Sequence, residues 1–151
     1  MLENRKVINE FKGKYRFLSN FWPASIEWLG QIYPTVEHAY QAAKTDDYTM
    51  NEWIRSAPSP GEAKRRGRSL KTTIPKWESI KLIIMSALID RKFTHPELAK
   101  ALLNTGNSVL EEGNLWGDEF WGVDLRTGKG ANHLGIILME TRDALRCLER
   151  N

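Results

Sequence analysis

The sequence predicts an α+β protein: a compact, mostly helical single domain with a small antiparallel sheet. Long segments carry apolar residues at helical spacing, and short apolar runs bounded by Gly, Asn and Pro lie between them. No internal repeat, low-complexity tract or linker divides the 151 residues. A chain of this length is most simply one domain, so we expect residues 1–151 to form a single domain.

The first half of the chain combines strands with capped helices. Residues 7–11 and 25–33 are typical of strands, and the second run contains a Gly that predicts a hairpin. A helix is expected over residues 35–45 with Thr35 as its N-cap, followed by a short helix over residues 49–56.

A capping box marks the start of the next helix, because Ser59 and Glu62 are three residues apart around Pro60. Residues 76–93 repeat apolar side chains every three or four positions, which predicts a core helix. The stripe expected to face the core comprises Trp77, Ile80, Ile83, Ile84, Ala87 and Leu88.

The last third of the chain is expected to hold two helices and two strands. One helix covers residues 96–104, with a Pro in its first turn. The strands are "SVLEEG" at 108–113 and "EFWGV" at 119–123. The final helix, 132–149, has a buried stripe made of Leu134, Ile137, Leu138, Thr141, Leu145 and Leu148.

Composition indicates an ordinary soluble protein, since 41% of residues are hydrophobic and 27% are charged. No apolar run reaches the length of about 20 residues that a membrane helix needs. The N-terminal decapeptide lacks an apolar segment, so no secretory signal is expected. The single cysteine, Cys147, fits a reducing compartment and predicts a cytoplasmic protein. The net charge of +3 is too small to demonstrate nucleic-acid binding, but it suits a phosphate-bearing ligand.

"YPTVEHAYQAAKT", residues 33–45, places chemical groups on one helix. Glu37, Tyr40, Gln41 and Lys44 are three, four or seven residues apart and share a face, and His38 lies about 100° round from Glu37. Two interpretations are open. One is a solvated Glu–Lys face with a histidine that hydrogen-bonds into the core; the other is a set of groups presented to a pocket. Spacing alone favours the solvated face.

"AKRRGRSLK", residues 63–71, gathers Lys64, Arg65, Arg66, Arg68 and Lys71. The stretch is either a solvated basic helix end or a phosphate-binding site, in which guanidinium groups make bidentate contacts. A glycine just before Arg68 would let the backbone approach an anion closely.

"WGDEFWGVDLRTGKGANHLG", residues 116–135, combines two Trp-Gly pairs with Asp118, Asp124 and a Gly-rich loop before the final helix. A glycine loop at a helix N-terminus predicts an anion site, although this one lacks the Walker pattern. The three histidines are scattered along the chain and no Cys/His set has zinc spacing, so we expect no metal site.

The order of six short motifs resembles the NADAR family, which includes the riboflavin biosynthesis intermediates N-glycosidase. The resemblance runs from about Phe11 to Arg142. It implies a compact, largely helical α+β domain without a cofactor. The motifs are "FLSNF" (17–21), "YPTVEHAYQAAK" (33–44), "AKRRGR" (63–68), "KWESIK" (76–81), "FWG" (120–122) and "GKGANHLGIILMETR" (128–142).

The resemblance also implies hydrolysis of an N-glycosidic bond between ribose and an exocyclic amine, in ADP-ribose-like or ribose-phosphate ligands. Such cleavage passes through an oxocarbenium-like sugar, which a carboxylate stabilises while a second acid protonates the leaving amine. Catalytic roles are implied for Glu37, Asp118, Trp77 and Lys44. Substrate contacts are implied for Ser19, Asn20, Phe21, His38, Arg65, Arg68, Trp121, Gly122, Lys129 and Asn132.

Two roles are open for Lys44: it either holds Glu37 ionised or attacks a ring-opened ribose as a Schiff base. The expected substrate is ADP-ribosylated guanine in DNA or RNA. The alternatives are riboflavin-pathway ribosylamino-pyrimidines, a non-catalytic ADP-ribose-binding module, and a nucleic-acid-binding protein that uses the basic stretch and the tryptophans. Riboflavin-type members have an acidic residue after the Trp-Gly pair, where this chain has Val123, Asp124 and "LRTG". That difference puts the substrate in doubt more than the reaction.

Overall fold

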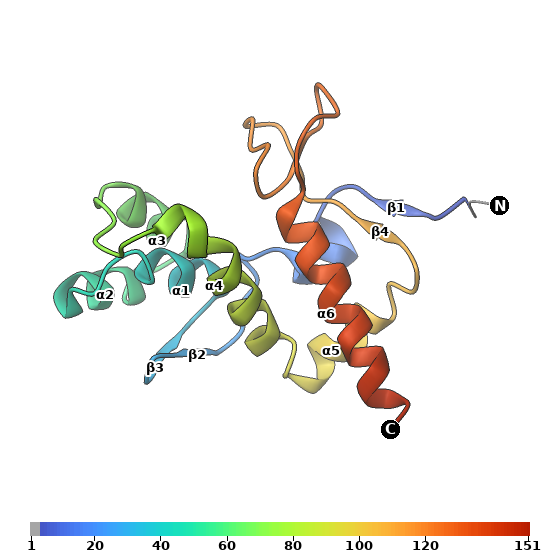
Figure 1. The fold of residues 1–151 in the computed structure, drawn as a ribbon, viewed down its shortest axis with the longest axis horizontal. Coiled ribbons are helices and arrows are strands. Elements are labelled where there is room, and N and C mark those ends of the chain that lie inside the picture. Colours follow the sequence, from blue (N-terminus) through green and yellow to red (C-terminus); the bar gives the residue numbers. More distant parts are fainter. Residues whose placement is uncertain (1–3) are drawn as a thin grey trace. The chain divides into compact units, whose positions relative to one another are not determined.

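The computed structural model describes residues 4–151, and over these residues it contains six α-helices, one 3-10 helix and six short strands. The expected α+β class, mostly helical, is confirmed (Figure 1). Residues 20–92 form one compact unit, and residues 93–151 join the N-terminal segment up to Ser19 to form the other. The single domain expected over the whole chain stays a prediction. The first three residues, where no secretory signal is expected, lie outside the described residues.

In the unit of residues 20–92, helix α1 (Val36–Ala42) is the central element. It packs against the other three helices and both strands of this unit, and all seven of its residues are buried. A helix that is buried all round must satisfy its polar side chains within the protein. The surrounding elements are β2 (Ile26–Trp28), β3 (Gln31–Tyr33), α2 (Tyr48–Arg55), α3 (Pro60–Arg68) and α4 (Trp77–Lys92).

The predicted hairpin is confirmed. Strands β2 and β3 pair antiparallel, with Trp28 opposite Gln31, which leaves a two-residue turn. Both turn residues, Leu29 and Gly30, have positive φ (47° and 81°), as a type I′ turn requires. Glycine adopts such an angle freely, whereas Leu29 adopts it under strain.

Local caps begin the helices where the sequence predicts them. The Thr35 side chain accepts a hydrogen bond from the backbone N–H of His38, and that of Ser59 accepts one from Glu62. Of the two hydrogen bonds of the expected capping box, only the one from the Glu62 N–H to the Ser59 side chain is found within residues 4–151. The Glu62 carboxylate pairs with Arg65 and Arg66 of the same helix.

Helix α4 buries a stripe that differs from the expected one. Ile83 was expected in the core and is 70% exposed. It lies two residues from the fully buried Met85, which is about 200° round the helix. The sequence repeat is rich in isoleucine on several sides, and tertiary packing decides which side is covered. The buried residues of α4 are Trp77, Met85, Leu88, Ile89 and Lys92.

The second unit, residues 4–19 with 93–151, contains two parallel strand pairs and two packed helices. β1 pairs with β4, and β5 pairs with β6, so among the strands of residues 4–151 the expected antiparallel pairing is found in the hairpin β2–β3. Its elements are β1 (Val7–Ile8), η1 (Gly13–Leu18), α5 (Pro96–Leu103), β4 (Val109–Leu110), β5 (Gly113–Asn114), β6 (Val123–Asp124) and α6 (His133–Glu149).

Helix α6 buries Leu134, Ile137, Leu138 and Thr141, as expected, but Leu148 in its last turn is 72% exposed. The segment "EFWGV" is a strand only at Val123. The carbonyl groups of the preceding residues instead accept hydrogen bonds from backbone N–H groups at the N-terminus of α6. Within residues 4–151, no helix has the length and apolar character needed to span a membrane.

Candidate active site

The predicted site residues divide between the two units. One set lies in residues 20–92 and is centred on α1: Asn20, Phe21, Glu37, His38, Lys44, Arg65, Arg68 and Trp77. The other set lies in the second unit: Ser19, Asp118, Trp121, Gly122, Lys129 and Asn132. Each set is built by its own local interactions.

Glu37 lies in the first turn of α1 and is only 7% exposed. Its Oε1 accepts a 2.8 Å hydrogen bond from the side-chain amide of Gln41, one turn along the helix. Its backbone N–H donates to the carbonyl of Asn20 over 3.1 Å. Burial raises the pKa of the Glu37 carboxyl, and the Gln41 bond opposes that rise. The solvated Glu–Lys face that spacing alone favours is therefore wrong.

Three cations act on this carboxyl. The charges of Lys64, Lys44 and Arg68 all favour the ionised form of Glu37. Lys44 is itself half-buried, and burial lowers the pKa of its ammonium group while the charge of Glu37 opposes that shift. A carboxyl with a raised pKa close to an amine with a lowered pKa is typical of functional sites.

Aromatic rings lie beside these charges. The rings of Tyr40 and Trp77 have centroids 5.5 Å apart and an interplanar angle of 45°. The Nζ of Lys44 lies 5.3 Å from the centroid of Tyr40, within range of a cation–π contact. The aromatic pair therefore connects the first residue of α4 to the Glu37–Lys44 face of α1.

Asn20 and Phe21 lie a few residues before the hairpin β2–β3. The side-chain amide of Asn20 donates to the sulfur of Met85 over 3.6 Å. Its Oδ1 is buried and accepts no hydrogen bond within residues 4–151. Lys64 Nζ lies 6.0 Å from the centroid of the exposed Phe21 ring. An unsatisfied buried acceptor is a place where a water or a ligand donor is expected.

Both ring nitrogens of His38 make hydrogen bonds within the fold. Its Nδ1 lies 2.7 Å from the Thr35 hydroxyl and its Nε2 lies 3.0 Å from the Ala57 carbonyl. Because a carbonyl only accepts, Nε2 carries the proton and Nδ1 accepts from Thr35. Burial lowers the pKa of the imidazole. This is the core histidine of the first interpretation, and its predicted substrate contact stays a prediction.

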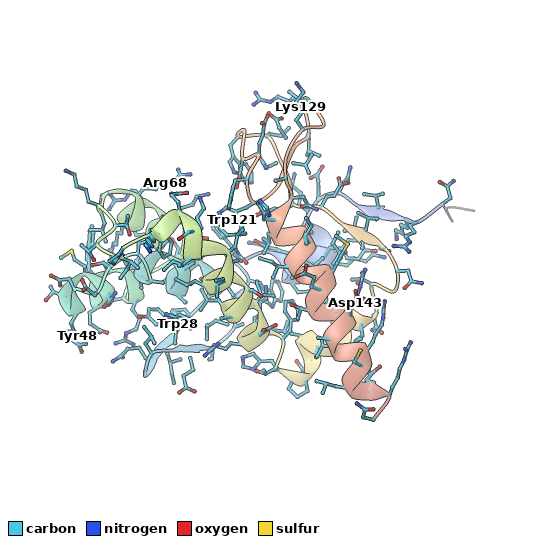
Figure 2. All side chains as sticks on the ribbon, viewed as in Figure 1. Trp28, Tyr48, Arg68, Trp121, Lys129 and Asp143 are labelled. Atoms are coloured by element: carbon cyan, nitrogen blue, oxygen red, sulfur yellow. The ribbon has the colours of Figure 1, made fainter. Side chains whose placement is uncertain are left out.

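The arginines of α3 have different partners. Arg65 makes a two-bond pair with Glu62 at 2.8 and 2.6 Å, and Arg66 bonds the same carboxylate and the Trp53 carbonyl. Arg68 lies exposed at the helix end (Figure 2). Its side chain makes no hydrogen bond or ion pair within the described part of the chain. It is therefore the arginine of this helix best placed to receive an anion.

Gly67 has a different role from the one expected. It is buried in α3, and a Cβ at this position would overlap the side chain of Gln41. Its lack of a side chain lets α3 approach α1 closely. The expected role of admitting an anion to the backbone is wrong, because the space beside Gly67 is filled by Gln41.

In the second unit, Asp118 organises a turn. Its Oδ1 accepts hydrogen bonds from the backbone N–H groups of Phe120 (3.0 Å) and Trp121 (2.9 Å). The buried Asn114 side chain bonds both the N–H and the carbonyl of Asp118. One carboxylate oxygen thus holds the loop, and the half-buried side chain has a fixed direction.

The "FWG" segment is bound to the start of α6. The carbonyls of Phe120, Trp121 and Gly122 accept from the backbone N–H groups of residues 133, 134 and 132, respectively. These amides are therefore unavailable to an anion, contrary to the expectation from the Gly-rich loop. A Cβ at Gly122 would overlap the carbonyl of Glu112. Glycine is needed at 122 for this close approach.

Asn132 caps α6 in a left-handed conformation with φ of 53°. Its side chain accepts from the N–H of Glu112 over 3.0 Å and donates to the carbonyl of Leu110 over 2.8 Å. Lys129 lies at the exposed end of the preceding loop (Figure 2). Buried Asp124 holds that loop by accepting from the N–H and guanidinium of Arg126, which lower its pKa. Roles of Asn132 and Lys129 in substrate binding stay predictions.

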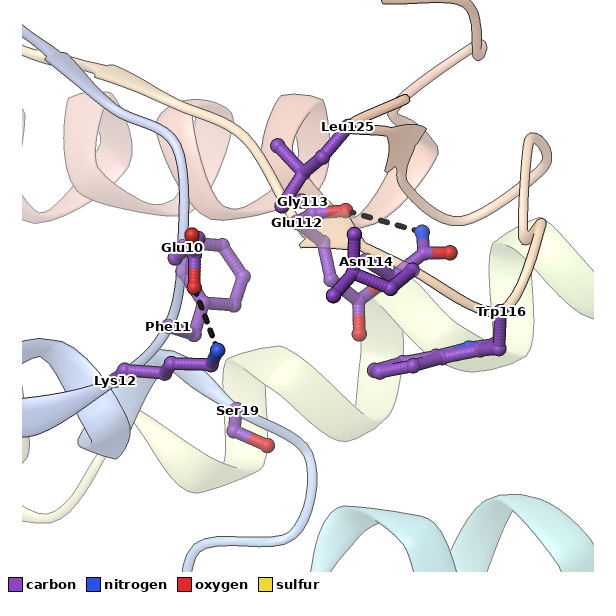
Figure 3. Close-up of a pocket in the computed structure, with 10 residues that line it drawn as sticks. Glu10, Phe11, Lys12, Ser19, Glu112, Gly113, Asn114, Trp116 and Leu125 are labelled. Carbon is purple, nitrogen blue, oxygen red and sulfur yellow. Dashed lines mark hydrogen bonds and ion pairs between the residues drawn. The ribbon is translucent and has the colours of Figure 1, made fainter. Parts of the chain in front are cut away.

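Ser19 lines a pocket of about 230 Å³ within the second unit (Figure 3). The pocket mixes apolar rings with polar groups, and an ion pair of 2.8 Å between Lys12 and Glu10 lies on one side. Asn114, which holds Asp118, is part of the wall. The remaining lining residues are Phe11, Glu112, Gly113, Leu115, Trp116 and Leu125.

From the sequence, Gln41 was placed on the helix face and Lys64 in the basic stretch, but neither was among the predicted site residues. The signal for Gln41 is its position four residues after Glu37, from which a side-chain amide reaches a carboxylate. No group of three or more His, Cys, Asp or Glu side chains in residues 4–151 has a geometry for holding a metal ion.

A buried carboxyl, a half-buried lysine and an aromatic pair form the candidate active site of this small α+β protein. In a comparison with known proteins the NADAR domain matches residues 8–146, so the chain belongs to the NADAR family. N-glycosidase YbiA of Escherichia coli is 41% identical over 135 residues, which cover 87% of this chain and 82% of that protein. N-glycosidase Npun_R5314 of Nostoc punctiforme is 37% identical, and the match covers 89% of this chain and 88% of that protein.

A riboflavin biosynthesis protein of Vibrio vulnificus, VVA0006, is 38% identical over 85% of this chain but only 35% of its own length. Among solved structures, the NMR structure of E. coli YbiA matches with a TM-score of 0.82 and 35% identity, covering 99% of this chain and 93% of that one. The expected family is therefore confirmed by both sequence and structure.

Proposed function

We propose that this chain hydrolyses the N-glycosyl bond between a phosphorylated ribose and an exocyclic amine, and that its substrate is guanine carrying ADP-ribose in nucleic acid. The reaction class is the one for which its relatives from E. coli and Nostoc are named. As a member of this family the chain is a hydrolase that acts on N-glycosyl bonds.

The observation that carries the mechanism is the buried Glu37 carboxyl beside Lys44. Cleavage of a ribosyl amine develops positive charge on the sugar, and a carboxylate in a water-poor site stabilises that charge strongly. Burial raises the pKa of the Glu37 carboxyl, whereas Gln41 and the three cations oppose that rise. These four groups therefore favour the ionised form that the proposed reaction needs.

A phosphate contact is assigned to Arg68. Its guanidinium has no competing carboxylate in the described residues, whereas Arg65 and Arg66 are paired with Glu62. Lys64, on the same helix, adds charge close to Glu37. A pyrophosphate bound by these cations would hold the ribose at a fixed distance from the helix.

The role of Asp118 as the acid for the leaving amine stays a prediction. Its Oδ1 is used in the turn, so Oδ2 is the oxygen left for that role. The substitution Asp118→Asn keeps the Oδ1 acceptor and therefore the turn, while it removes the acid. It separates a chemical role from a structural one.

The second candidate substrate is a ribosylamino-pyrimidine phosphate, and the riboflavin biosynthesis name of the Vibrio relative favours it. It shares the ribose, the exocyclic amine and the phosphate with the first. A module that only binds ADP-ribose is disfavoured, since a buried carboxyl beside a phosphate site weakens anion binding.

The test is incubation with a guanine-ADP-ribosylated oligonucleotide and, separately, with a ribosylamino-pyrimidine phosphate, followed by mass spectrometry of the released sugar. We expect ADP-ribose from the first substrate and none with the Glu37→Gln variant. Release from the pyrimidine alone would assign the riboflavin-type substrate. A melting shift with ADP-ribose but no release of sugar from either substrate would indicate that the protein binds ADP-ribose without catalysis.

A further inference from the structure

Gln41 contacts both Glu37 and Gly67, two residues of the unit 20–92 that lie far apart in the sequence. Its amide donates to Glu37 Oε1 over 2.8 Å, and its side chain packs directly on Gly67 of α3. A Cβ at Gly67 would overlap the Oε1, Cδ and Cβ atoms of Gln41. The amide could rotate away, but the Cβ is fixed by the α1 backbone, so the helices themselves would have to separate.

The orientation of the amide follows from this packing. Its oxygen is the end nearest to Gly67, and its nitrogen faces Glu37. The reverse orientation would turn a carbonyl oxygen toward the carboxylate and repel its ionised form.

We propose that Gln41 is a positioning residue for the N-glycosidase reaction, and that Gly67 is the surface that fixes its amide against Glu37. The inference rests on the proposed function of Glu37. Gln41 does not touch the substrate; it sets the direction of the Glu37 carboxylate, which does, and favours its ionised form.

Gln41 also lowers the stability of the protein, and packing alone does not explain why such a residue stands here. It is only 3% exposed, and its Oε1 accepts no hydrogen bond within the described residues. A buried acceptor without a partner destabilises a protein, and an apolar side chain of the same length would avoid that cost. Residues that lower stability in this way are expected at functional sites.

The surrounding charges cannot replace this bond. Lys44 from α1 and Lys64 and Arg68 from α3 act on Glu37, and Lys81 from α4 acts on Lys44. These charges favour ionisation from several directions. Within residues 4–151, Gln41 alone donates a hydrogen bond to a carboxylate oxygen of Glu37.

Two variants test the arrangement. Gln41→Met keeps the length of the side chain and removes the donor, and Gly67→Ala keeps the donor and displaces it. Gly61→Ala on the same helix is the matched control, because a Cβ there meets only the Ser59 Oγ at 3.9 Å. For each variant, Glu37 is titrated in the free protein through its carboxyl carbon by NMR, and kcat and KM are measured against pH.

We expect the Glu37 pKa to rise in Gln41→Met and in Gly67→Ala, because the bond that favours the ionised form is lost. The acid limb of the kcat profile should move to higher pH with it. At the optimum, kcat should fall by up to about 10²-fold with little change in KM. Gly61→Ala should match the wild type. In a Glu37→Gln background, Gln41→Met should cost no further activity.

An unchanged Glu37 titration in folded Gln41→Met would overturn the proposal, and so would an additive loss in the double variant. The NMR titration needs no substrate. A protein with the expected titration shifts but no N-glycosidase activity would therefore refute the proposed function and not the contact between Gln41 and Glu37.

Discussion

The indole of Trp77 packs against the ring of Tyr40, with centroids 5.5 Å apart, at the point where α4 begins beside α1. Trp77 is only 7% exposed, so the ring contributes to the core even though its neighbour Tyr40 contacts the catalytic lysine candidate. The Trp77 side chain is therefore placed to stabilise the core and to support the candidate site around Lys44.

Trp77→Phe should stay folded and lose activity. Phenylalanine retains an aromatic ring against Tyr40, so stability should fall by less than the roughly 3–5 kcal/mol expected for Trp77→Ala. Turnover should drop clearly, because a smaller ring leaves the ribose less well placed. The measurements are thermal unfolding, tryptophan fluorescence on ADP-ribose addition, and turnover per folded molecule. A Phe variant that is badly unstable yet fully active would make Trp77 a core residue only.

Glu37→Gln should increase stability at neutral pH while it reduces turnover by about 10²–10⁴-fold. The folded-state pKa of Glu37 is raised, so its protonated form is the one that favours folding. That contribution is present at low pH and is lost as pH rises through the folded pKa. Glutamine stays neutral throughout. Chemical denaturation at several pH values, with Glu97→Gln as an exposed control, checks the sign; a destabilised variant at pH 7 contradicts it.

Arg68→Ala should weaken binding of ADP-ribose at low ionic strength, and the difference from wild type should shrink as salt is added. The reason is that a guanidinium–phosphate contact at an exposed site is screened by ions. Titration calorimetry at two salt concentrations measures this effect. Lys100→Ala on α5 removes one exposed charge elsewhere and should bind like the wild type. Equal affinities for Arg68→Ala and the wild type at low salt would make "RRGR" a solvated helix end.

Lys44 should be trapped by borohydride during turnover. Burial lowers the pKa of its ammonium group, which raises the fraction of neutral amine able to attack a ring-opened ribose. Reduction of the resulting imine leaves a stable secondary amine on Lys44 that peptide mass spectrometry identifies. Lys44→Arg keeps the charge but cannot form the imine and should be inactive. An active Lys44→Arg without any adduct in the wild type assigns the electrostatic role instead.

The stability of the protein should fall on acidification partly through His38. The folded-state pKa of this imidazole is lowered by burial, so its neutral form favours folding. That contribution is present above the ordinary histidine pKa of about 6.5 and is lost as pH falls through the folded value. NMR titration of the ring protons should place the pKa of His38 below the ordinary histidine value. A value at or above the ordinary range would show that the bonds to Thr35 and Ala57 do not hold the neutral ring.

Several features were determined by the sequence itself because they depend on residues close together in the chain. Thr35 and Ser59 cap helices three residues away, and the hairpin turn at 29–30 is set by a two-residue connection. The order of the short motifs likewise identified the family, which the match over residues 8–146 confirms.

Tertiary structure alone decided which faces are buried and what the polar groups contact. Ile83 fits a helical apolar stripe and is nevertheless 70% exposed, whereas Met85, about 200° round α4, is fully buried. The parallel pairing of β1 with β4 joins residues about a hundred positions apart, which no local pattern encodes. Gly67 was expected to face an anion and instead admits Gln41, since only the packing of α3 on α1 brings these two positions together. The sequence supplied Glu37 as a candidate, and burial in the folded chain made it a perturbed acid.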